Sequence, residues 1–144
     1  MTDRMVQAYY RHEHGDDPVI LQSPSDVDAL IDALLSSDPS ENLAALHSME
    51  RPLMPAEVPD HELLAGVDGE SQVGVLAFMD DENFVSLAPS KGRGEVSYFI
   101  MGNMTEFPSC SEISIALVRQ AIEEFLSSGG QRPTGVQWQE SEFW

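Results

Sequence analysis

The chain has 144 residues, and 25 Asp and Glu against 7 Lys and Arg give it a formal net charge of −18. Hydrophobic residues make up 42% of it, enough for a packed core, so we expect one folded domain over residues 1–144 rather than a disordered acidic tail. Nucleic-acid ligands and anionic membrane surfaces are excluded as expected partners, because both require basic patches.

The sequence also bears on the compartment. The single cysteine, Cys110, has no partner for an internal disulfide, which fits a reducing environment. The N-terminal residues contain no apolar stretch typical of a signal peptide, and no run is long enough to span a membrane. We therefore expect a cytoplasmic protein, with its core over residues 5–139 and fraying over residues 140–144.

The N-terminal third carries short β-type segments. Residues 6–10 are rich in β-forming side chains and predict a strand, whereas residues 11–17 are polar and turn-like. Residues 19–22 fit either a second short strand or the lead-in to a helix. Residues 43–49 predict a further strand, and residues 51–59, with three prolines, predict an extended ordered loop.

One helix is predicted between these segments. Ser23 supplies a hydroxyl cap, Pro24 suits the first helical position and Asp26 places an acid in the first turn. Apolar residues at helical spacing follow on one face, namely Val27, Leu30, Ile31 and Leu34. Residues 36–40, which include a proline, are expected to end the helix.

The middle of the chain is dominated by predicted strands, at residues 62–67, 73–78, 84–88 and 95–101. Turn residues at 68–69, 80–83 and 91–94 separate them. Because these connections are too short for crossover helices, we expect the four strands to form an antiparallel meander.

The C-terminal third predicts a second helix and a last strand. The helix runs from Ser114 to Ser127 and ends at Gly129-Gly130, and residues 135–139 form the strand. The expected fold class is therefore α+β. It consists of an antiparallel or mixed sheet of about six or seven strands with two helices packed on one face, and the other face is exposed or covered by loops.

His12 and His14 form the best candidate for metal binding. They are two residues apart, so on a strand both would point to one face. A zinc site needs three or four ligands, but His47 and His61 are isolated and Cys110 has no second cysteine. We therefore expect no metal and no cofactor, although a small metal-dependent enzyme using His12 and His14 stays as an alternative. No catalytic residue is assigned, since the chain has no nucleophile elbow, P-loop or dinucleotide fingerprint.

Three consecutive acids occupy a predicted hairpin tip, where they would make a projecting anionic knob. They are Asp80, Asp81 and Glu82. The turn is either simply solvated or a contact for a basic partner, and it lacks the alternating ligand spacing of a calcium loop. The candidate partner-binding residues are these three acids, together with Asp68 and Glu70 of the preceding turn.

Several short segments occur in a characteristic order along the chain. They are Glu13-His14-Gly15, Asp17-Pro18-Val19, Arg51-Pro52-Leu53, residues 59–63, Gly66-Val67-Asp68, residues 73–74, residues 105–108, Ser111-Glu112-Ile113, residues 129–130, Arg132-Pro133-Thr134 and residues 136–139. The set resembles the immunity-protein family designated number one in bacterial polymorphic toxin systems. The resemblance spans about Tyr9 to Gln139.

The resemblance implies a non-enzymatic antitoxin that binds a toxin encoded beside it, often a nucleic-acid deaminase. It carries over no interface residues. A toxin that acts on nucleic acid must present a basic groove, which an acidic inhibitor can occupy. We therefore expect an immunity protein that neutralises a cognate secreted toxin by occluding this cleft. An acidic adaptor domain for another basic protein remains the alternative.

Overall fold

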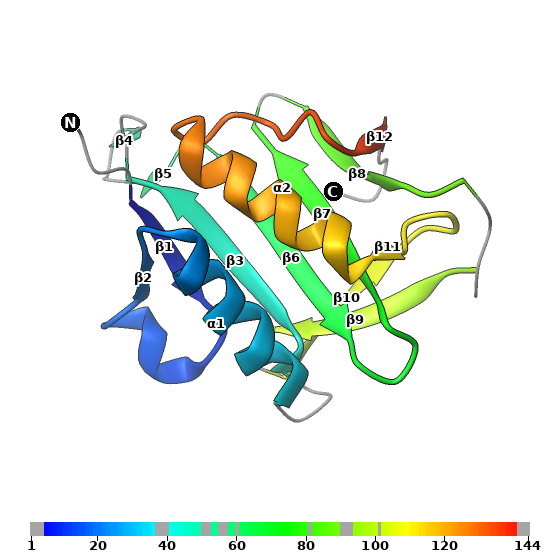
Figure 1. Ribbon diagram of the computed structural model, residues 1–144, viewed down its shortest axis with the longest axis horizontal. Helices are drawn as coiled ribbons and strands as arrows, with labels where there is room; N and C mark the ends of the chain where they lie inside the picture. The colour runs from blue at the N-terminus through cyan, green and yellow to red at the C-terminus, as the bar shows by residue number, and fades with distance from the viewer. Residues whose placement is uncertain are drawn as a thin grey trace.

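The computed structural model describes residues 5–36, 41–49, 53–54, 58–59, 61–80, 82–89, 94–100 and 102–140 (Figure 1). Its elements in chain order are β1 (Val6–Tyr9), the short 3-10 helix η1 (His12–Gly15), β2 (Val19–Leu21), α1 (Pro24–Ser36), β3 (Leu43–Ser48), β4 (Leu53–Met54), β5 (Val58–Pro59), β6 (Glu62–Asp68), β7 (Val73–Met79), β8 (Asn83–Leu87), β9 (Val96–Ile100), β10 (Asn103–Phe107), β11 (Ile113–Ser114), α2 (Ile115–Ser127) and β12 (Gln137–Glu140).

The central sheet has eight strands, in the order β12-β8-β7-β6-β3-β1-β2 with β11 beside β7, and its neighbouring strands are antiparallel. One edge of β7 is divided, since Ala77 to Met79 pair with β8 and Val73 and Gly74 pair with β11. Where β8 leaves β7, the Leu76 N–H donates to the Ser86 hydroxyl at 3.1 Å. The expected α+β class is confirmed, with more strands than expected.

Both helices cover the same face of this sheet, as expected (Figure 1). The predicted apolar face of α1, centred on Leu30 and Ile31, is buried against it. On α2 the buried side chains include Val118, Ile122 and Phe125. Burying a side chain of this size stabilises the fold by about 1.5–3 kcal/mol. The apolar residues at helical spacing therefore predicted both helices correctly.

The predicted glycine signal at the C-terminal end of α2 is confirmed, and the structure adds a cap at the N-terminal end. The Ser114 hydroxyl caps the helix by accepting the Leu117 N–H at 3.2 Å. Gly129 and Gly130 follow the helix with φ of 74° and 94°, a region that residues with a Cβ avoid.

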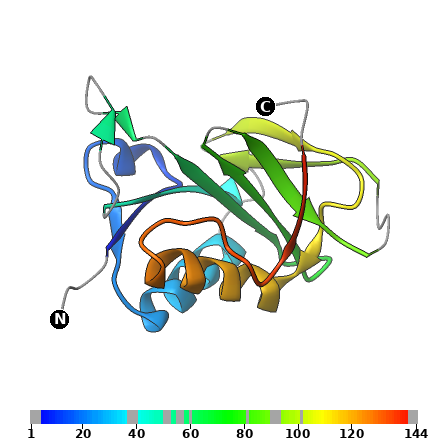
Figure 2. The ribbon, with the colours of Figure 1, turned by 90° about the horizontal axis from the view of Figure 1, so that it is seen from above.

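The opposite face of the sheet is covered by a two-stranded ribbon of β9 and β10 (Figure 2). Tyr98 and Phe107 point inward from the ribbon and pack on sheet residues that include Leu64 and Val75. The expectation of an exposed or loop-covered face is therefore wrong. The predicted meander is correct for β6, β7 and β8, but β9 pairs with β10 instead of continuing it.

Two smaller segments differ from the prediction. Within residues 51–59, Leu53 pairs with Pro59 and Met54 pairs with Val58 as a short hairpin, and residues 51–52 and 55–57 lie outside the described residues. The last strand begins two residues later than expected and includes Glu140, while residues 141–144 lie outside the description. In the part of the chain that the structure describes, no helix is long and apolar enough to cross a membrane.

Candidate functional site

Acidic side chains lie over the surface of the described molecule. None of the described Asp and Glu residues is buried. The arginines of the described ranges are each held in a local contact. Arg11 Nε lies 3.5 Å from Glu41, Arg119 Nε lies 2.9 Å from Asp28, and the Arg132 guanidinium stacks on the Phe84 ring at 4.1 Å. The field around the described part of the molecule is therefore negative.

The predicted partner-binding acids fall into two turns at opposite ends of β7. Asp68 ends β6 and Glu70 lies in the turn that follows it, and Asp80 and Glu82 lie in the turn between β7 and β8. Asp81 lies outside the described residues. At about 3.3 Å per residue, the length of β7 separates the two turns by roughly 20 Å. The five acids thus belong to two separate places on the surface.

The two turns share one local design. Asp68 Oδ1 accepts the N–H of Glu70 at 2.9 Å, and Asp80 Oδ1 accepts the N–H of Glu82 at 3.2 Å. This hydrogen bond two residues along the chain is what makes Asp common in turns. It also holds the first carboxylate of each turn against the backbone, beside the second acid.

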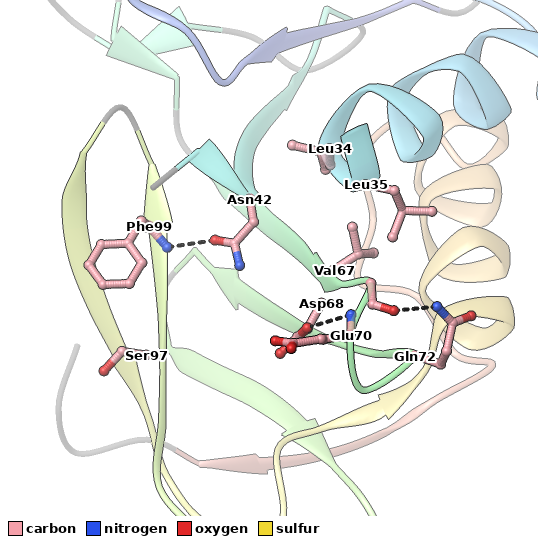
Figure 3. Close-up of a pocket in the computed structure, with 10 residues that line it drawn as sticks. Leu34, Leu35, Asn42, Val67, Asp68, Glu70, Gln72, Ser97 and Phe99 are labelled. Carbon is pink, nitrogen blue, oxygen red and sulfur yellow. Dashed lines mark hydrogen bonds between the residues drawn. The ribbon is translucent and has the colours of Figure 1, made fainter. Parts of the chain in front are cut away.

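A hollow of about 670 Å³ opens beside the first turn (Figure 3). We call it the 68–70 hollow. It is bounded by Leu34 and Leu35 at the end of α1, by Asn42, by Val67 and the turn from Asp68 to Gln72, and by β9. Gln72 has a φ of 57°, and its side-chain amide donates to the Gly69 carbonyl, which closes the turn.

Asn42 joins the ribbon to the sheet at this hollow. Its Oδ1 accepts the Phe99 N–H at 2.8 Å (Figure 3). Its backbone N–H donates to the Phe99 carbonyl at 3.0 Å, and its own carbonyl accepts the Val67 N–H at 3.1 Å. Sequence reasoning missed this residue, because an Asn before a strand reads as an ordinary turn residue. Its role depends on β9, which is more than fifty residues away along the chain.

A second hollow, of about 490 Å³, lies beside the other acidic turn. We call it the 80–82 hollow. Asp80, Glu82 and Phe84 form one side, and Gln131, Arg132 and Thr134 form the other. The stacked Arg132 places a positive charge in the lining of this hollow, next to the predicted acids.

Glu124 on α2 fixes the loop that carries Arg132. Its carboxylate accepts the Thr134 N–H at 2.6 Å, the Thr134 hydroxyl at 2.8 Å and the Gly135 N–H at 3.1 Å. Partial burial by itself raises the pKa of Glu124, but the hydrogen bonds from Thr134 and Gly135 outweigh it, so the pKa is lowered. The Trp138 indole N–H donates to the Pro133 carbonyl at 2.8 Å and holds the same loop from β12.

The histidines have structural contacts. His14 is buried, and its Nδ1 accepts the N–H groups of Tyr10 at 3.2 Å and Arg11 at 3.1 Å. The side chain of His12 lies outside the description. Among the described residues, no group of three or more His, Cys, Asp or Glu could hold a metal ion.

His47 and His61, which look isolated in the sequence, are neighbours in space, with ring centroids 6.0 Å apart. The pairing of β3 with β6 brings them together. His47 Nε2 lies 3.1 Å from the Glu62 carboxylate, and His61 Nε2 accepts the Ser48 N–H at 2.8 Å.

Comparison with known protein families identifies the family of this chain. A family model described as immunity protein Imm1 matches residues 15–140, a span that includes both acidic turns and both helices. No curated protein matches the chain. The family match confirms the resemblance drawn from the collinear segments of the sequence.

Proposed function

The chain belongs to the Imm1 family of immunity proteins, and from this premise we propose that it neutralises a cognate nucleic-acid deaminase toxin by covering the substrate cleft of that toxin. An immunity role means binding to a toxin protein. The proposal adds the chemistry of the target and the mode of inhibition. It also places the chain in the cytoplasm, as a binding protein without turnover.

The excess of surface carboxylates carries this proposal. A deaminase binds a polyanionic strand and takes its target base into a pocket, so its cleft must be basic. The formal net charge of −18, with none of the described acids buried, makes this chain a complement to such a cleft. Charge of this kind can raise association rates towards about 10⁸ M⁻¹s⁻¹ at low salt, and the rate falls with ionic strength.

Charge alone does not hold a complex together for long. A stable interface buries about 1,600 Å² in total and gains most of its energy from a few well-packed anchors near its centre. Large apolar side chains that the described surface exposes are Ile20, Leu35, Met49 and Met104. Of these, Leu35 lines the 68–70 hollow and so lies beside an acidic turn.

The test is co-expression with the toxin domain encoded by the neighbouring gene. We expect growth to be restored only against that toxin, with an unrelated deaminase toxin of equal toxicity as the control. With purified proteins, the chain should block deamination of a single-stranded DNA oligonucleotide in proportion to complex formation. Undiminished toxicity beside soluble, folded protein would overturn the proposal.

A further inference from the structure

We propose that the 68–70 hollow is the docking site for the toxin, and that it receives one basic side chain, an arginine or lysine, from the toxin surface. This inference rests on the proposed function. Beyond the proposed function, it identifies the end of the sheet that contacts the toxin and the kind of side chain that enters the hollow.

Three sources of negative charge meet at the 68–70 hollow. Two are the carboxylates of Asp68 and Glu70. The third is the C-terminal end of α1, which carries the negative end of the helix dipole and has no basic residue in its last turn. None of the described arginines lines the hollow. A cation is therefore the favoured occupant.

The walls suit the shape of a basic side chain as well as its charge. Leu34 and Val67 are core residues at the inner side of the hollow, and Leu35, 36% exposed, extends the apolar wall outward (Figure 3). Arginine and lysine pack their aliphatic stems on such surfaces while the charged head stays with polar groups.

The hollow is also ordered before anything binds. Asp68 is held by the N–H groups of Glu70 and Ser71, and Asn42 fixes β9 against the sheet. A site that is already in place loses little conformational entropy on association, which favours affinity.

The 80–82 hollow lacks this complementarity. Arg132 is part of its lining and lies over the Phe84 ring, so an entering cation meets a like charge. The acids of that turn still add to the long-range field. The two ends of β7 are thus expected to contribute differently, with one for docking and the other for steering.

The repeated turn design supplies a matched experiment. The variant Asp68→Asn with Glu70→Gln removes two charges and keeps the oxygen that caps the turn. The variant Asp80→Asn with Glu82→Gln makes the same change at the other hollow. Both are measured as the full chain against the toxin domain encoded beside it, by surface plasmon resonance, with circular dichroism melting as the check on folding.

We expect the first variant to weaken affinity at least about tenfold, mainly through faster dissociation, and the second to weaken it less than about threefold. Backbone amide exchange should also slow across residues 66–73, and not across 79–84, when wild-type chain binds toxin. Equal losses in both variants, or protection only at residues 79–84, would overturn the inference while wild-type neutralisation still stands. If wild-type chain fails to bind or neutralise the toxin, the proposed function fails and the inference falls with it.

Discussion

Glu124 and Thr134 are joined by two hydrogen bonds to the same carboxylate oxygen, at 2.6 Å from the backbone N–H and 2.8 Å from the hydroxyl. The contact connects α2 to the loop before β12 across ten residues of chain. Because the hydrogen bonds favour the charged form, the pKa of Glu124 lies below its usual value of about 4.5 in the folded protein.

A pH dependence of stability follows from this contact. A carboxylate with a lowered folded-state pKa stabilises the fold above its unfolded-state pKa, and the contribution is lost as pH falls through the folded-state value. We expect Glu124→Gln to be less stable than wild type at pH 7, with the difference shrinking below about pH 4.5. Urea unfolding of both proteins across this range measures it. A difference that stays constant with pH would contradict the assignment.

Gly66 lies where the ribbon approaches the sheet closely, so we expect this position not to tolerate a larger side chain. A Cβ on Gly66 would lie 2.8 Å from the Tyr98 ring and 2.9 Å from a Leu43 methyl group. Both neighbours are fully buried, so we expect Gly66→Ala to cost about 1–3 kcal/mol of unfolding free energy. The control is Gly69→Ala, where the nearest atom is the end of the Leu35 side chain at 3.3 Å. Chemical denaturation should separate the two, and equal stabilities would contradict the packing argument.

Asn42 should act as the attachment point of the ribbon. Replacing it with Ala leaves the Phe99 N–H without its side-chain acceptor, which we expect to cost about 1–2 kcal/mol. The amide of Phe99 should then exchange faster in hydrogen-exchange measurements. Asn103→Ala on the exposed part of β10 serves as the control and should change neither quantity. Unchanged exchange at Phe99 would mean that other contacts hold the ribbon.

Steering and docking predict different kinetic effects of charge. Replacing Asp80, Asp81 and Glu82 together with Lys should slow association with the toxin and flatten its salt dependence, because long-range attraction is reduced. Dissociation should stay close to that of wild type if the contact lies at the other end of β7. Stopped-flow mixing over a series of salt concentrations measures both rates. An unchanged association rate would show that this turn does not steer the partner.

Helices and strands could be predicted from the sequence where the local pattern of apolar residues matches the burial in the fold. Both helices were found because their apolar residues repeat at helical spacing, and Ser114 and Gly129 mark the ends of α2. The strand β10 was missed because only Phe107 is buried in it, so no alternating pattern is visible. The segment β9 was recognised as a strand, but its pairing with β10 depends on the burial of Tyr98, which a local pattern does not reveal.

The candidate site was predicted in part. Both acidic turns lie in the hairpins where the sequence placed them. The predicted meander already implies that the length of β7 separates the two turns. It does not imply the hollows beside them. Leu35 reaches the first hollow from α1, and Arg132 reaches the second from the loop before β12. Such contacts between distant segments become visible only when the chain is folded.

The covering of the sheet on both faces has a consequence for how binding specificity can change. The apolar interior is closed by helices on one side and by the ribbon on the other, and the two acidic turns extend beyond it. Their residues can therefore be exchanged without rebuilding the interior. Since we propose that these turns contact or steer the toxin, substitutions at a few turn positions can change the binding specificity while the core stays the same, much as an antibody framework carries interchangeable loops.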